Sequence, residues 1–329
     1  MISVEHLTKR YGELVAVDDL SFEIQEGHVY GFLGPNGAGK STTMNIMTGC
    51  LSATEGKVVI DGHDIFEEPR EAKRQIGYLP EQPPLYLNET PEEYLRFVGE
   101  AKGLRGADLE RQIREVIEQV RIGDVRRRSI AALSKGYKQR VGIAQALLGG
   151  PKVIILDEPT VGLDPLQIIE IRDLIRQLGQ THTVIFSSHI LSEVQTICDQ
   201  ILIIAKGKLV AFGGPEELES ALRSPSEILL TAESSVEEVR EILERVEHIA
   251  GVEIEEKLSG LTAVRLHTDA EDVHDVSRAL FFAFAWRQRA LLEISLKRAG
   301  LEDIFIELTE DGGGSPGAAD TEESEASEL

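Results

Sequence analysis

The stretch that decides the fold runs from Val29 to Ser41 and reads VYGFLGPNGAGKS. Its first five residues, Val29–Leu33, are a short apolar run that is typical of a buried strand. The next eight match G-x-x-x-x-G-K-[ST], a loop whose backbone N–H groups converge on phosphate oxygens. In this pattern Lys40 neutralises the β- and γ-phosphates of a nucleotide and the Ser41 hydroxyl binds Mg²⁺. The strand before the loop and the Lys-Ser pair argue against a glycine-rich turn without a ligand.

A second apolar run, Val153–Leu156, ends in two carboxylates, Asp157 and Glu158. Acidic side chains at the end of a buried strand are costly unless a cation or water meets them. On its own, such a pair is more often a helix cap or a solvated turn. Beside a phosphate loop, however, Asp157 is expected to support Mg²⁺ and Glu158 to polarise an attacking water.

The first two hundred residues alternate strand-like and helix-like patterns, which is typical of an α/β sheet. Apolar runs at 183–186 and 201–205 are again short and uninterrupted. Such strands suit a sheet that is covered on both faces, and its ligands gather beyond the carboxyl ends of the strands. Between Pro91 and Val125 the pattern is helical. We therefore expect an α/β domain over residues 1–217.

After residue 215 the pattern becomes β-α-β-β-α-β, the order of a ferredoxin-like unit, with a last short helix at 301–308. We expect this small α+β domain to span residues 218–310. Ser234 and Glu237 are predicted to form the capping box that opens its first helix.

The second predicted helix of this domain is strongly apolar. Its core face is predicted to consist of Val276, Ala279, Leu280, Ala283 and Phe284. The aromatic cluster Phe281–Phe284 and Trp286 are interpreted as core of this domain. A surface for a partner is the alternative, because Phe282 falls off the helical face.

The chain of 329 residues is 42% hydrophobic with a formal net charge of −23, so it can bury a core. No apolar run approaches the roughly 18 residues that span a bilayer, and the N-terminus shows no secretory signal. Its two cysteines make neither a disulfide framework nor a zinc spacing. The acidity argues against a nucleic-acid partner, and Arg126–Arg128 are interpreted as a solvated face. Residues 311–329, with six acidic and no basic side chains, are expected to be a disordered acidic tail.

Further motifs follow in a fixed order. They read LSKGYKQ at 133–139, DEPT at 157–160, VGLD at 161–164 and SSH at 187–189. With the phosphate loop, this set resembles an ATP-binding cassette (ABC) ATPase subunit over about residues 2–217. The resemblance implies a P-loop NTPase cassette with a RecA-like core and a helical subdomain. The form LSKGYKQRVGIAQAL is most similar to exporters of the ABC-2 type, and among them to the gliding-motility-associated group.

The resemblance implies roles for residues outside the phosphate loop. Tyr11 would stack on adenine, unless it is an ordinary half-buried strand aromatic. Ser134 and Gly136 would present the start of the signature helix to the γ-phosphate held by another subunit. Asp164 would communicate across that interface, and His189 would contact the γ-phosphate and orient Glu158. The expected nucleotide contacts are Tyr11, Gly34, Pro35, Asn36, Gly37, Ala38, Gly39, Lys40, Ser41, Thr42, Ser134, Gly136 and Asp164.

The sequence departs from the family's pattern at three positions. Lys135 and Tyr137 stand where the family usually has glycine and often has glutamine, and Lys135 is expected to point to solvent. Where a glutamine normally touches Mg²⁺, this chain has Glu81, with Gln82 next to it. A carboxylate oxygen can replace the amide oxygen, so Glu81 is taken as a metal contact, with Gln82 as the alternative.

The expected function is that of a Mg²⁺-dependent ATPase subunit. Two cassettes, expected to be two copies of this chain, would close around two ATP and drive separate membrane-spanning permease subunits from the cytoplasmic face. A groove lined by Leu85, Tyr86, Tyr94 and Phe97 is predicted to receive a short helix of the permease. A soluble ABC ATPase of DNA repair, translation or cofactor assembly is the alternative, as is a nucleotide-binding regulator without turnover.

Overall fold

The computed structural model describes residues 1–221, 226–257, 260–270 and 272–297. Its central sheet has six strands in the order β10-β9-β3-β8-β7-β6, all parallel except for the edge pair β10 and β9. Every residue of β3, β7 and β8 is buried, as expected for a sheet covered on both faces. The strands are β3 Val29–Leu33, β6 Ile76–Leu79, β7 Val153–Leu156, β8 Thr183–Ser188, β9 Gln200–Ala205 and β10 Lys208–Gly213.

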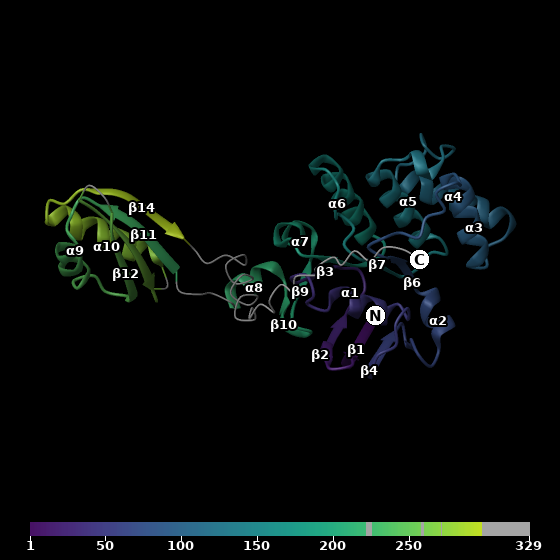
Figure 1. The fold of residues 1–329 in the computed structure, drawn as a ribbon, viewed down its shortest axis with the longest axis horizontal. Coiled ribbons are helices and arrows are strands. Elements are labelled where there is room, and N and C mark those ends of the chain that lie inside the picture. Colours follow the sequence, from purple (N-terminus) through teal and green to yellow (C-terminus); the bar gives the residue numbers. More distant parts are fainter. Residues whose placement is uncertain (222–225, 258–259, 271, 298–329) are drawn as a thin grey trace, which may run out of the picture.

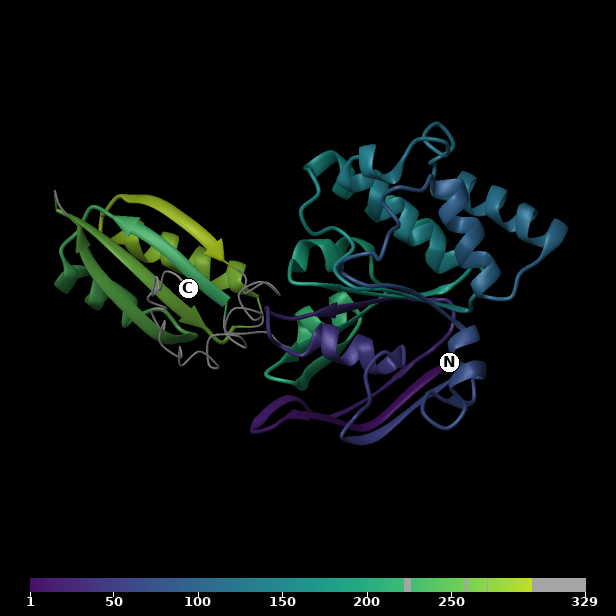
Figure 2. The same ribbon diagram turned by 45° about the vertical axis from the view of Figure 1, so that its right-hand side comes forward.

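A smaller antiparallel sheet lies on one side of this central sheet (Figure 2). Its strand order is β2-β1-β4-β5, and helix α1 (Lys40–Met47) lies between the two sheets. A hydrophobic cluster that includes Phe32 and Met44 fills the space between them. The strands are β1 Ile2–Tyr11, β2 Leu14–Ile24, β4 Glu55–Ile60 and β5 His63–Asp64.

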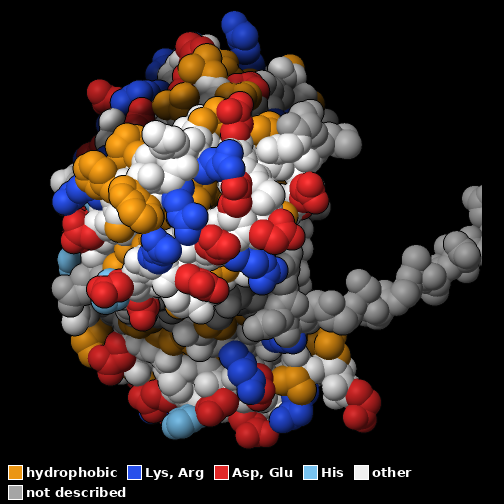
Figure 3. Space-filling view, turned by 90° about the vertical axis from the view of Figure 1, so that its left-hand side faces the viewer, with side chains coloured by type: hydrophobic (Ala, Val, Ile, Leu, Met, Phe, Trp, Pro, Cys, Tyr) orange, Lys and Arg blue, Asp and Glu red, His pale blue; other side chains and the backbone are white. Residues whose placement is uncertain are grey.

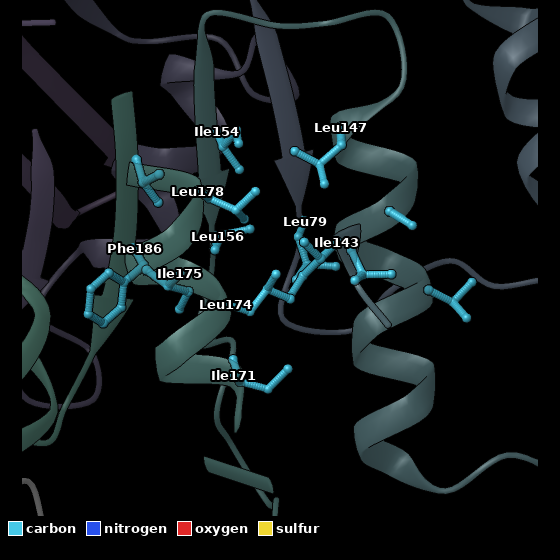
Figure 4. Close-up of a cluster of buried hydrophobic side chains, with 14 of the residues drawn as sticks. Leu79, Ile143, Leu147, Ile154, Leu156, Ile171, Leu174, Ile175, Leu178 and Phe186 are labelled. Atoms are coloured by element: carbon cyan, nitrogen blue, oxygen red, sulfur yellow. The ribbon is translucent and has the colours of Figure 1, made fainter. Parts of the chain in front are cut away.

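Helices cover the other side and form a helical subdomain beyond it (Figures 1 and 2). Figure 4 shows how Leu147 and Ile143 of α5 face Leu79 and the side chains of β7 and α6. At Thr90, a capping box with Glu93 begins α3. The helices on this side are α3 Pro91–Ala101, α4 Gly106–Gln119, a 3₁₀ turn Ile130–Ala132, α5 Lys135–Leu147, α6 Pro165–Gly179, α7 Leu191–Ile197 and α8 Pro215–Ala221. Helix α2 (Pro69–Arg74) lies instead beside the smaller sheet, near β5.

A third sheet follows, the C-terminal sheet, with strand order β12-β13-β11-β14 and antiparallel neighbours throughout. Two helices, α9 and α10, pack on it around a separate hydrophobic cluster that contains Phe284. The element order matches the predicted β-α-β-β-α-β. The elements are β11 Ser226–Ala232, α9 Val236–Leu243, β12 Ile249–Lys257, β13 Leu261–Thr268, α10 Val273–Trp286 and β14 Leu291–Lys297.

Two predictions for this region are wrong. The capping box of α9 is made by Ser235 and Glu238, one residue later than predicted, because Ser234 uses its hydroxyl on the Glu238 carboxylate. On the predicted core face of α10, Val276, Leu280 and Phe284 are buried, whereas Ala279 is exposed. The exposed fractions are 55% for Phe281, 63% for Phe282 and 74% for Trp286. The sheet covers one narrow stripe of α10, so these three rings face outward. Figure 3 views the molecule from the end where the C-terminal sheet lies and shows hydrophobic side chains gathered near the left edge of this view.

The predicted helix at 301–308 and the predicted acidic tail at 311–329 lie outside the described residues. Within the described residues, no helix is long and apolar enough to cross a membrane.

Candidate nucleotide site

The phosphate loop joins the end of β3 to the start of α1, as the sequence predicts. Gly39 has φ 102°, and a Cβ at this position would lie 2.5 Å from the carbonyl oxygen of Ala16. Only glycine accepts both that backbone conformation and that approach. Helix α1 therefore begins directly at Lys40 with its first N–H groups turned toward the loop.

A cavity of about 430 Å³ opens at this loop. The loop residues from Asn36 to Thr42 form one side of it, and residues from four other segments form the rest. The predicted site residues Glu81, Glu158 and His189 all line it. The full lining is Ala16, Asn36, Gly37, Ala38, Gly39, Lys40, Ser41, Thr42, Glu81, Glu158, Val161 and His189.

Lys40 is buried beneath the loop. Its Nζ donates to the carbonyl oxygens of Gly34 (2.8 Å) and Pro35 (3.2 Å) and lies 3.3 Å from Glu158 Oε1. Gly34 and Pro35 thus meet Lys40 through their carbonyls and are not among the cavity-lining residues. The buried ammonium is the positive charge at the floor of the site.

Asp157 lies at the carboxyl end of β7, directly behind the phosphate loop. Its Oδ1 accepts hydrogen bonds from Ser41 Oγ (3.1 Å) and Ser187 Oγ (2.7 Å). Burial raises the pKa of this carboxyl, with the two serine hydroxyls acting in the opposite direction. A buried carboxylate beside a serine hydroxyl and a phosphate loop is the kind of oxygen donor set that Mg²⁺ uses together with phosphates and water. The residues present therefore fit a magnesium ion.

Glu158 and His189 form a close pair at the edge of the cavity. His189 Nδ1 lies 3.0 Å from Glu158 Oε2, and the Glu158 side chain is buried whereas that of His189 is 40% exposed. Glu158 has φ 47°, in the left-handed region. This conformation turns the chain at the end of β7 and is one that non-glycine residues rarely adopt.

Ser187 joins these groups and was missed by the sequence analysis. Its hydroxyl accepts from the Glu158 backbone N–H (2.7 Å) while it donates to Asp157. Because β7 and β8 are parallel neighbours, their carboxyl ends lie side by side. That adjacency, together with the Ser-Ser-His stretch, is the signal that could have identified Ser187.

Two further predicted contacts are placed differently with respect to the cavity. Glu81 lines it and its neighbour Gln82 does not, so the structure favours Glu81 at this position. Tyr11, at the end of β1, is 49% exposed and does not line the cavity. Its ring lies 5.2 Å from Lys9 Nζ. The exposed ring is open to stacking, but it lies outside the residues that line the cavity.

The remaining predicted contacts gather elsewhere. Ser134 begins α5 by accepting from the Tyr137 N–H, and Asp164 begins α6 by accepting from the Gln167 N–H. With Gly136 they line a second hollow of about 360 Å³, the signature hollow. Lys135 is exposed as predicted, and its ammonium lies against Gly162. Ser134, Gly136 and Asp164 do not line the cavity at the phosphate loop.

Comparison with known proteins gives the family. The ABC transporter family model matches residues 17–161. The linearmycin resistance ATP-binding protein of Bacillus subtilis (strain 168) is 33% identical over 310 residues, which cover 94% of this chain and 98% of that protein. The bacitracin transport ATP-binding protein of Bacillus licheniformis is 34% identical over 319 residues, with coverage of 96% and 99%.

Solved structures match about two thirds of the chain. An ATP-binding subunit of an ABC transporter has 32% identity and a TM-score of 0.61, covering 67% of this chain and 92% of that one. A dimeric cassette with ADP and phosphate in a post-hydrolysis state has 27% identity and a TM-score of 0.59, covering 65% and 98%. The chain therefore belongs to the ATP-binding subunits of ABC transporters, the ATPases that couple ATP hydrolysis to transport.

Proposed function

We propose that this chain is the Mg²⁺-dependent ATPase of an exporter of the ABC-2 type. The observation that carries the proposal is the meeting of Lys40, Glu158 and His189 at one cavity beside the phosphate loop. Asp157 adjoins this cavity through its hydrogen bond with Ser41. Relatives that match nearly the whole chain are named for linearmycin resistance and bacitracin transport. The gliding-motility-associated group remains a prediction from the signature sequence alone.

In the proposed mechanism, the loop N–H groups and Lys40 bind the phosphates of ATP. Ser41 and Asp157 would hold Mg²⁺, with Glu81 facing the same space. When bound, Mg²⁺ neutralises charge on the β- and γ-phosphates. Glu158 takes up a proton from the attacking water, and His189, 3.0 Å away, orients Glu158 and contacts the γ-phosphate. Lys40 must leave Glu158 for the phosphates before the carboxylate can act.

The signature hollow supports a second cassette as partner. Ser134, Gly136 and Asp164 lie outside this chain's own cavity, which supports a role for them in completing a site on another subunit. The start of α5 directs its N–H groups into that hollow, where an anion is favoured. We propose a dimer of two copies, with two ATP at the shared interface. The dimeric cassette among the similar solved structures supports the dimer.

The proposed contact with the membrane-spanning permease is the aromatic surface of Tyr86, Leu87 and Phe97. Each is about half exposed, and the Tyr86 and Phe97 rings lie 5.1 Å apart. The groove predicted from sequence is corrected in part. Tyr94 is buried beneath Tyr86, and Leu85 packs against the core, so both support the surface from within. Docking here would place the subunit on the cytoplasmic face of the membrane.

The sheet order β12-β13-β11-β14 supports one further proposal, that residues 218–310 form a ferredoxin-like domain separate from the cassette of residues 1–217.

Glu158→Gln tests the ATPase mechanism. The amide keeps the shape of the side chain but cannot take up the proton of water, so turnover is expected to fall at least 100-fold while ATP binding persists. The closed dimer should then accumulate, visible as a larger dimer fraction in light scattering with Mg-ATP. Asp173→Asn on the exposed side of α6 is the matched control. Hydrolysis by Glu158→Gln at the wild-type rate would remove Glu158 from the mechanism.

A further inference from the structure

A buried carboxylate outside the cavity connects two chain segments that each carry a cavity-lining residue. Glu193, on α7, is 1% exposed. Its Oε2 accepts hydrogen bonds from Thr160 Oγ1 (2.8 Å) and Ser188 Oγ (2.9 Å). Its Oε1 lies 3.3 Å from Nη2 of Arg172 on α6. None of these four residues lines the cavity at the phosphate loop.

The two hydroxyls belong to the segments that carry the reactive pair. Thr160 follows Glu158 by two residues, after the left-handed turn at the end of β7. Ser188 is the last residue of β8 and directly precedes His189. The Glu193 carboxylate therefore links the segment that bears Glu158 to the segment that bears His189 and holds the two at a fixed separation.

The chemistry of the residue suits this task. A carboxylate accepts two hydroxyl bonds on one oxygen and still presents its second oxygen to a cation. Burying it is costly unless it is paired and hydrogen-bonded, and Thr160, Ser188 and Arg172 supply those partners. Ser188 is held in turn, because its Oγ accepts from the Ile190 N–H at 3.0 Å. Oε2 of Glu193 thus accepts two hydrogen bonds, whereas its buried Oε1 faces Arg172 as an ion pair without a hydrogen bond.

We propose that Glu193 is a positioning residue for ATP hydrolysis. It keeps Glu158 and His189 at the separation at which they act together on the attacking water, and it touches neither the nucleotide nor the water itself. The proposal rests on the roles proposed for Glu158 and His189. Displacements of about 1 Å in a catalytic group can cost 10²-fold in rate, so loosening the two segments should lower kcat and leave ATP binding intact.

Thr160→Val is the first test, because valine keeps the shape of threonine and removes one of the two hydroxyl bonds. We expect kcat to fall about ten-fold, while the Kd of Mg-ATP, measured by calorimetry, stays within two-fold of wild type. Glu193→Ala, which removes both bonds, should lower kcat further. Glu193→Gln should recover much of that loss, since its amide oxygen still accepts both hydroxyls and Arg172, 23% exposed, can turn to solvent. Asp173→Asn, which removes an exposed ion pair with Arg176, is the control for charge loss on α6.

A double-mutant cycle completes the test. Thr160→Val should add little in the Glu193→Ala background, because both variants remove the same bond. If Glu193→Ala does not fold, Thr160→Val alone decides. A kcat of Thr160→Val within two-fold of wild type would overturn the proposal, as would a parallel loss of ATP affinity. Glu158→Gln is measured beside these variants: if it too hydrolyses ATP normally, the proposed mechanism itself has failed, whereas an inactive Glu158→Gln with normal Thr160→Val refutes only the positioning role.

Discussion

Asp157 is subject to two opposing effects. Binding of Mg²⁺ requires an ionised carboxylate at this position, but the side chain is buried, which disfavours the ionised form. Burial raises the pKa of Asp157 above that of the unfolded chain, so the folded state holds this proton more tightly. Stability therefore falls as pH rises through the folded-state pKa, and at neutral pH the ionised group costs stability when no cation is bound.

Asp157→Asn is accordingly expected to raise the melting temperature of the nucleotide-free protein at neutral pH. The amide oxygen still accepts from Ser41 and Ser187, but it carries no charge to bury. The gain should vanish below about pH 4, where the carboxyl of the unfolded wild type is also protonated. ATP hydrolysis should be lost. Melting curves at several pH values check this, and equal or lower melting temperatures at neutral pH would contradict it.

Lys40→Ala gives the complementary result in the presence of nucleotide. A ligand at 100 times its Kd stabilises the folded state by about 2.7 kcal/mol, so Mg-ATP should raise the melting temperature of wild type. The variant lacks the buried ammonium beneath the loop and should show no such rise. Lys152→Ala, at an exposed ion pair with Asp61, is the control and should behave as wild type. Equal shifts in Lys40→Ala and wild type would remove Lys40 from the binding site.

At the scale of elements, local patterns predicted the site best where the chemistry sits at strand ends. The apolar runs before Gly34 and Asp157 predict buried parallel strands, which are β3 and β7. Both pair in parallel with β8, so their carboxyl ends lie at the same edge of the sheet. The hydrogen bond between Thr160 and Glu193 could not be predicted, because it depends on how α7 packs against a turn 33 residues earlier in the chain. The outward rings of α10 were missed for a related reason: periodicity identifies a buried stripe but not how wide the covering sheet is.

The aromatic surface beside α3 can be tested as an element. Tyr86→Glu combined with Phe97→Glu places two charges on half-exposed positions outside the nucleotide cavity. The isolated subunit should keep its ATPase activity within about two-fold, while co-purification with the membrane subunit should fail. Phe66→Glu, at a ring that is 40% exposed elsewhere on the cassette, is the matched control. Retention of the complex by the double variant would show that this surface is not the docking site.

At the scale of the molecule, the described residues form three hydrophobic clusters, and the one under the C-terminal sheet shares no residue with the two of the cassette. Phe284, fully buried there, is the largest side chain of that cluster. Phe284→Ala is expected to destabilise the C-terminal sheet by about 3–5 kcal/mol. Mg-ATP binding should be unchanged. Calorimetry should show one transition lowered and another unmoved, and a joint loss of both would contradict a separate domain.

The outward position of Trp286 has an optical consequence. It is the only tryptophan of the chain, and its side chain lies at the end of α10 with Arg245 over the ring. Intrinsic fluorescence excited at the tryptophan band therefore comes from this one place, with a red-shifted, solvent-like emission that iodide quenches readily. Nucleotide added to the isolated subunit should leave the spectrum unchanged. A blue shift on adding any partner would report, without a label, that the partner covers the end of this helix.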